Sequence, residues 1–227
     1  GTSARRTPGL KELLARTETA IRMTLEAYPD NWKWTNGIQQ ERARMLLPLA
    51  WLVRLEDTAV RRGWLRRIAD DLLASQDASG AIREELGHPA TGVYGPPKSN
   101  GEYGKGEAPL IQENGDPVGD LLYTMNYAAI GLHEAACATG ERRYRDAADR
   151  LADFFCRTMI RSARHPQLDG GWTRGFDFAR WEHGGSNSDR CWGAWCLETG
   201  WIQGWILLTL ALRELDVSLW TLLQDAA

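Results

Sequence analysis

AWLVRLED, at residues 50–57, recurs in altered form as AIGLHEAA at residues 129–136 and as TLALRELD at residues 209–216. Successive copies begin 79 and 80 residues apart, and such a constant spacing is typical of an internal repeat. Each copy lies in a largely apolar stretch with few turn residues, which indicates a helix buried on most sides. The chain is therefore expected to repeat one structural unit three times.

An amphipathic helix accompanies each buried one along the chain. Buried helices are expected at 39–56, 119–139 and 192–215, and amphipathic ones at 8–28, 59–76 and 142–160, with a short tail at 217–223. Repeated helical hairpins bury their apolar inner helices by curling around a common axis. The expected fold is all-α, an α/α toroid that holds about three hairpins in this chain.

Composition limits the classes of partner. The 227 residues carry a net charge of −3 and suit one large domain, and this charge does not favour nucleic-acid binding. No apolar run reaches the length of about 18 residues that a membrane span needs. No signal peptide is visible at the start, so cytoplasmic and periplasmic locations both stay open. We expect neither nucleic-acid nor membrane partners.

Cysteine and histidine are too sparse and too scattered for a zinc site. The four cysteines, Cys137, Cys156, Cys191 and Cys196, form no CxxC pair, and the chain has four histidines. We interpret the cysteines as free and mostly buried thiols. No metal and no cofactor is expected.

The segment 169–205, DGGWTRGFDFARWEHGGSNSDRCWGAWCLETGWIQGW, carries six of the eleven tryptophans among many polar side chains. Aromatic rings stack on the apolar faces of pyranose rings, and polar groups hydrogen-bond the hydroxyls. A plain core would not bury so many polar groups. The segment therefore predicts a carbohydrate site, with Trp172, Trp181 and Trp192 as sugar contacts and Trp201 and Trp205 in the core.

Three further stretches carry a family resemblance: NWKWTNG at 31–37, the run from ENGDPVGD to LADFF at 113–155, and DGGWTRGFDF at 169–178. They resemble the six-hairpin glycosidases, (α/α)-toroid enzymes that include uronic-acid-cleaving glycosidases and related epimerases. The resemblance covers nearly the whole chain and is architectural. It implies an oligosaccharide or polysaccharide substrate, and no catalytic motif of one family is matched residue by residue.

The hairpin count departs from that family, whose closed ring has six. We expect residues 1–227 to form one toroid domain that is the C-terminal part of a longer chain, or a ring completed by a second half-toroid or another copy. The loop 77–117, rich in glycine and proline, is interpreted as a lid or substrate-gripping insertion, and a plain surface excursion is the alternative.

The loops that precede inner helices are where the site is expected, because the N-termini of those helices converge at one mouth of the ring. The first carboxylate group there is Glu113, Asp116 and Asp120. Asp116 before Pro117 is a helix-start signature, and Asp120 in a first turn suits the helix dipole. Glu113 has no such structural role.

The second group is Asp177, Glu182 and Asp189. Asp177 lies among aromatic residues, and an apolar surround raises a carboxyl pKa, as a general acid at neutral pH requires. The alternative is an Arg–Asp pair that braces the loop, with Arg174 or Arg180 as the partner. Asp189 also suits a helix cap.

A lone acidic residue, Glu198, lies inside an apolar inner helix and is either functional or paired. Glycoside hydrolysis needs two carboxyl groups across one bond. We assign Asp177 as the acid and Asp120 or Glu113 as the base. The substrate-binding candidates are Trp172, Arg174, Arg180, Trp181, Glu182, Asn187, Asp189, Trp192, Glu198 and Tyr123.

The predicted function is a glycoside hydrolase that uses carboxylate acid/base catalysis, on a sugar that includes uronic acid if the arginines bind its carboxylate. Two alternatives stay open. One is a sugar epimerase or polysaccharide lyase on the same fold, and the other is a non-catalytic carbohydrate-binding module.

Overall fold

The computed structural model describes residues 9–95, 109–184, 197 and 201–225. Helices account for most of these residues, as the sequence predicts for an all-α fold. The α-helices are α1 (Leu10–Glu26), α2 (Ile38–Leu55), α3 (Ala59–Leu73), α4 (Thr124–Thr139), α5 (Arg142–Thr158), α6 (Ile202–Glu214) and α7 (Leu219–Asp225). Three short strands accompany them: β1 (Val118–Asp120), β2 (Gly175–Asp177) and β3 (Glu182–His183).

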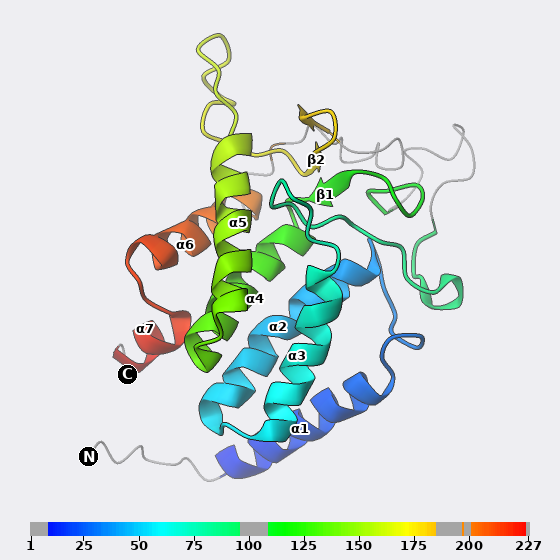
Figure 1. Cartoon of the computed structure of the whole chain (residues 1–227), viewed down its shortest axis with the longest axis vertical. Helices are drawn as coiled ribbons and strands as arrows, with labels where there is room; N and C mark the ends of the chain where they lie inside the picture. The colour runs from blue at the N-terminus through cyan, green and yellow to red at the C-terminus, as the bar shows by residue number, and fades with distance from the viewer. Residues whose placement is uncertain (1–8, 96–108, 185–196, 198–200, 226–227) are drawn as a thin grey trace.

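Two helices, α2 and α4, pack side by side at the centre of the molecule (Figure 1). Helix α3 covers α2, α5 covers α4, and α6 packs on the other side of α4. The three repeat segments lie in or run to the ends of α2, α4 and α6. The predicted alternation of inner helices (α2, α4, α6) and outer helices (α3, α5) is therefore confirmed in its order, in a toroid-like arrangement. The prediction that the last inner helix is buried on most sides is wrong, because α6 leaves Leu207 and Leu208 exposed.

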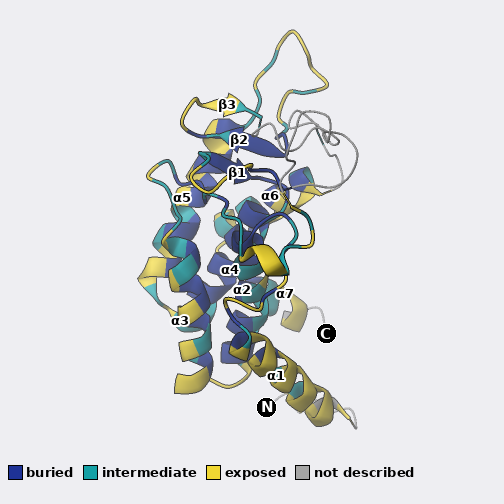
Figure 2. Cartoon of the chain, turned by 90° about the vertical axis from the view of Figure 1, so that its right-hand side faces the viewer, coloured by how far each residue is buried: buried dark blue, intermediate teal, exposed yellow. Residues whose placement is uncertain are grey.

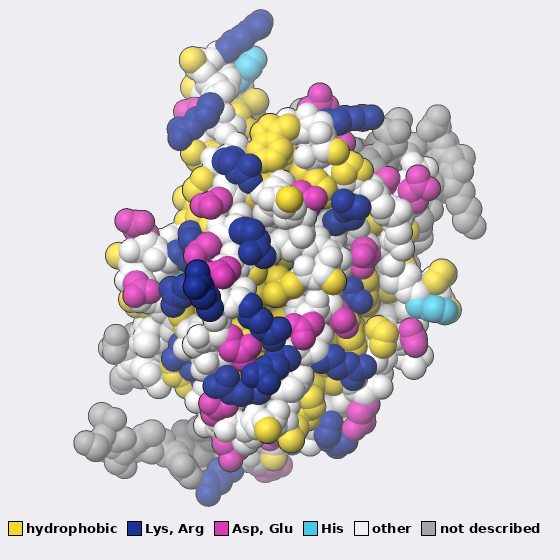
Figure 3. Space-filling model, in the orientation of Figure 1, with side chains coloured by type: hydrophobic (Ala, Val, Ile, Leu, Met, Phe, Trp, Pro, Cys, Tyr) yellow, Lys and Arg dark blue, Asp and Glu magenta, His cyan; other side chains and the backbone are white. Residues whose placement is uncertain are grey.

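The inner pair is in close contact because a glycine lies where the helices cross. A Cβ atom at Gly131 of α4 would come within 2.5 Å of the Cβ of Leu46 in α2. Most side chains of α4 are buried, whereas α3 and α1 are exposed over much of their surface (Figure 2). The outward face of α3 and α5 is covered by arginine and carboxylate side chains (Figure 3). This charged outer face follows from the amphipathic pattern of the outer helices.

The predicted start of the fourth helix is wrong. Residues 118–120 form β1, which pairs antiparallel with β2 in the register Val118↔Asp177 and Asp120↔Gly175, and α4 begins only at Thr124. Asp116 caps no helix, because its Oδ2 accepts the backbone N–H groups of Gln112 and Glu113. Asp120 closes the turn that leads into α4, through bonds from the N–H groups of Leu122 and Tyr123 to its Oδ1 at 2.8 and 2.9 Å, and no side chain caps the helix itself.

Two of the four cysteines lie in the described part of the chain. Cys137 and Cys156 are free, as predicted, but Cys156 is exposed and Cys137 half-buried, so the prediction of mostly buried thiols is wrong for these two. Cys191, Cys196 and the centre of the 77–117 loop, residues 96–108, lie outside the described residues. Among the described helices, none is both long and apolar enough to cross a membrane.

Candidate functional site

Three tryptophans of the 169–205 segment, Trp172, Trp201 and Trp205, are placed opposite to expectation. Trp172 is 1% exposed, and its indole N–H donates to the carbonyl of Phe155 at 2.8 Å, so it belongs to the core. Trp201 and Trp205, which were expected in the core, are 53% and 37% exposed. The difference is one of burial. Trp172 packs against α5, whereas Trp201, the residue before α6, and Trp205, inside α6, are exposed.

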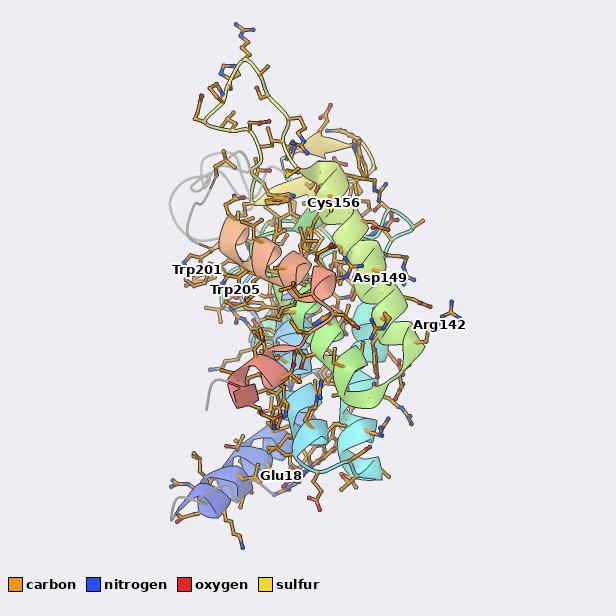
Figure 4. All side chains as sticks on the ribbon, turned by 90° about the vertical axis from the view of Figure 1, so that its left-hand side faces the viewer. Glu18, Arg142, Asp149, Cys156, Trp201 and Trp205 are labelled. Carbon is orange, nitrogen blue, oxygen red and sulfur yellow. The ribbon has the colours of Figure 1, made fainter. Side chains whose placement is uncertain are left out.

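The two exposed tryptophans extend an aromatic surface that begins on α4. Trp201 meets the ring of Tyr123 edge-on with 6.0 Å between centroids, and Trp205 meets Tyr127 in the same way at 5.1 Å. The two tyrosine rings stack at 6.4 Å. Trp201 and Trp205 project away from α5, on the side opposite the charged outer face (Figure 4). These four residues are called the aromatic surface below.

A guanidinium group lies over each tyrosine of this surface. The Cζ of Arg44 in α2 is 5.3 Å from the ring centroid of Tyr127, and that of Arg174 is 5.7 Å from Tyr123. Arg44 is partly exposed. Arg174, a predicted substrate ligand, is buried instead, where it donates to Asn36 at 3.3 Å and lies 3.9 Å from Asp120. Arg174 therefore packs on the ring of Tyr123 from inside the protein.

A carboxyl group that sequence reasoning missed reaches the same surface. Glu41, in the first turn of α2, accepts two 3.2 Å hydrogen bonds from Arg44. Its side chain is only slightly exposed. Burial raises the pKa of Glu41, although the Arg44 charge opposes this shift. The signal lay in the spacing Glu41–Arg44, which places both side chains on one face of a helix.

Asp177, the predicted acid, braces a turn. Its Oδ1 accepts the N–H groups of Ala179 and Arg180 at 3.0 and 2.9 Å, and the Nε of Arg180 lies 3.9 Å from Oδ2. This is the bracing alternative that the sequence left open. Glu182, opposite Asp177 in the β2–β3 register, is exposed. Asp177 and its contacts therefore all belong to the β2–β3 hairpin or its turn.

Trp181 sits at the tip of that hairpin with positive φ, at 59°. Its ring packs edge-on against Phe154 and Phe176, and the guanidinium of Arg157 covers it at 5.0 Å. The ring remains partly exposed. These contacts make Trp181 part of the outer packing of α5, so the aromatic surface is the larger exposed aromatic group.

The remaining candidates separate by burial. Asp120 is fully buried and closes the turn before α4, whereas Glu113 is exposed in the turn that Asp116 closes. Asn187, Asp189, Trp192 and Glu198 lie outside the described residues. In the described part of the chain, no three His, Cys, Asp or Glu side chains gather as metal ligands would.

A second missed carboxyl, Glu84, lies fully buried beside the start of α4. Thr124 donates to its Oε2, and the N–H of Glu85 donates to Oε1 at 3.2 Å. Burial, with the nearby charge of Asp120, raises the pKa of Glu84 to about 8. Nothing in the AIREELG motif at 81–87 distinguishes this residue from an exposed glutamate, because the segment has no helical or strand period.

No protein-family model matches the chain, and no curated protein matches it. Among solved structures, the chain is similar to cellobiose 2-epimerase from Spirochaeta thermophila, with 15% sequence identity and a TM-score of 0.44. The match covers 78% of this chain and 42% of that chain, so this chain spans less than half the length of the epimerase. This is a distant likeness and does not extend to activity.

Proposed function

We propose that this protein is a carbohydrate-active enzyme that binds a sugar against the aromatic surface and acts on it as a glycoside hydrolase. The observation that carries the proposal is the exposure of Trp201 and Trp205 beside two tyrosines and the Arg44–Glu41 pair. Leaving a large aromatic side chain in water forgoes about 1.5–3 kcal/mol of burial free energy, which a bound sugar ring recovers.

The polar groups at the edge of this surface suit a substrate with hydroxyl and carboxylate groups. Arg44 is accessible, planar and already oriented by Glu41 and by the ring of Tyr127. A guanidinium held in this way forms paired hydrogen bonds to a uronate carboxylate or to vicinal hydroxyls. We therefore propose a uronic-acid-containing sugar as the preferred substrate class.

Glu41 is the proposed proton donor to the leaving glycosidic oxygen. Its raised pKa keeps a larger fraction of the carboxyl protonated than an exposed glutamate has at the same pH. Hydrolysis also needs a second carboxylate, which activates water or attacks the anomeric carbon. Asp120 and Glu113, the bases predicted from the sequence, are the candidates for that role, and individual amide variants separate them.

The test combines binding and turnover. Oligosaccharide binding is followed by tryptophan fluorescence and calorimetry, and hydrolysis is assayed on aryl uronides and on neutral aryl glycosides. Trp201→Ala and Trp205→Ala are expected to weaken binding at least tenfold, whereas Trp181→Ala, which removes a partly exposed tryptophan elsewhere, leaves affinity unchanged. Equal loss in all three variants would contradict the assignment of the surface.

The same assays separate the alternatives. Sugar binding without turnover on any glycoside identifies a carbohydrate-binding module. Interconversion of a free sugar without cleavage identifies an epimerase. Wild-type protein that binds no uronate or neutral oligosaccharide overturns the proposal.

A further inference from the structure

Two buried carboxyl groups, those of Glu84 and Asp120, lie where the inner helices α2 and α4 begin. Asp120 closes the turn that precedes α4 by accepting from the N–H groups of Leu122 and Tyr123. Glu84 contacts the same helix through Thr124, its first residue. Both side chains are fully buried.

Glu84 also lies at the start of α2. Its carboxyl group packs against the backbone of Gly37, the residue that precedes this helix. Gly37, the residue before α2, leaves room for this approach, since a Cβ there would lie 2.1 Å from Oε1 of Glu84. The N–H of Ile38 donates to the carbonyl of Glu85 at 2.8 Å, which ties the same segment to the helix start.

We propose that Glu84 is a positioning residue that holds the start of α2 against the start of α4. The functional consequence rests on the proposed sugar site: α2 carries Glu41 and Arg44, Tyr123 immediately precedes α4, and Tyr127 lies within α4. A single carboxyl group thus sets the distance between the acid–arginine pair and the aromatic surface.

The charges around Glu84 explain why the neutral form is retained. Asp120 on β1 is acidic, and its repulsion adds to the cost of burying a charge. The nearby cations are already engaged, because Arg42 of α2 pairs with Glu85 at 3.3 Å and Arg174 lies beside Asp120. Arg83, on the segment itself, stacks over Phe178 at 5.6 Å. The pKa of about 8 agrees with this geometry.

The linkage to stability has a definite sign. The folded-state pKa of Glu84 lies above the value of an unfolded chain, so the contribution is fully present below the unfolded value, near 4.5, and is lost as pH rises through about 8. Alkaline pH therefore weakens the junction of α2 and α4 before the rest of the fold.

The test is amide hydrogen exchange at the first turns of α2 and α4 in the full chain, which needs no ligand. Glu84→Ala is expected to speed exchange in both turns at least tenfold, because both helix starts lose the side chain that packs between them. Glu84→Gln, which is neutral and nearly isosteric, keeps wild-type protection at neutral pH. Glu12→Gln, on the exposed face of α1, is the matched control with no effect.

A pH series completes the test. Between about pH 6 and about pH 9, protection of the two turns is expected to fall in the wild type but not in Glu84→Gln, after correction for intrinsic exchange. Faster exchange in only one turn, or equal losses in Glu84→Gln and Glu84→Ala, overturns the inference. Absence of sugar binding in the wild type would refute the proposed function alone, since the exchange result stands independently.

Discussion

The indole ring of Trp205 meets the phenol ring of Tyr127 edge-on, at an interplanar angle of 80° and a centroid distance of 5.1 Å. One ring comes from α6 and the other from α4. The contact therefore joins two inner helices through residues that are 78 positions apart in sequence. The guanidinium of Arg44 from α2 lies over the same tyrosine. Three inner helices therefore meet at one tyrosine ring, which makes Tyr127 the centre of the proposed site.

The buried and the exposed tryptophans are predicted to differ in their effect on stability. Trp172→Ala is expected to lower the free energy of unfolding by about 3–5 kcal/mol, because it empties a packed site and removes the indole donor from the Phe155 carbonyl. Trp201→Ala removes a largely exposed ring and leaves the unfolding midpoint in urea nearly unchanged. Urea denaturation followed by circular dichroism measures the unfolding of both variants. Equal losses of stability would contradict the burial of Trp172 and the exposure of Trp201.

Catalysis by Glu41 predicts a specific pH dependence. Glu41→Gln is expected to lower kcat by about 10²–10⁴, the usual contribution of a general acid, while KM changes little. In the wild type, kcat falls as pH rises through the raised pKa of Glu41, because the proton donor is lost. The variant has no such limb. A wild-type alkaline limb that persists in Glu41→Gln would assign the acid to another residue.

Asp177 is predicted to act through its turn. Asp177→Asn keeps an oxygen that accepts the N–H groups of Ala179 and Arg180, whereas Asp177→Ala leaves both without this partner. Loss of such a cap costs about 0.5–2 kcal/mol of folding free energy. We expect Asp177→Ala to be destabilised and Asp177→Asn to keep its melting temperature and activity. An inactive, fully stable Asp177→Asn would instead identify Asp177 as catalytic.

The crossing of α2 and α4 predicts contrasting results at two helical glycines. Gly131→Ala places a methyl group 2.5 Å from the Cβ of Leu46, and overpacking of this kind costs about 1–3 kcal/mol. Gly63→Ala in α3 meets no atom within 4 Å and gains about 1 kcal/mol of helix propensity. Thermal unfolding of the two variants compares them, and a stabilised Gly131→Ala protein would refute the close crossing.

The helices and their division into inner and outer were predictable because side-chain burial in a helix repeats every few residues along the chain. AWLVRLED, AIGLHEAA and TLALRELD all fall in, or run to the ends of, α2, α4 and α6. The three short strands were not predictable. Val118–Asp120 is too short to show a period, and its hydrogen bonds come from residues 175–177.

The site depends on tertiary structure for the same reason. Sequence alone determined that this chain is an all-α protein whose helices α2 and α4 are buried, and that a tryptophan-rich segment leads into α6. It did not determine which tryptophans face water. Trp172 is buried against α5, whereas Trp201 and Trp205 are exposed and contact Tyr123 and Tyr127 edge-on. Nor did it single out Glu41 and Glu84, since the desolvation that raises their pKa values comes from residues distant in sequence. Exposure and proton affinity are properties of what surrounds a side chain, and only the packing of distant segments supplies those surroundings.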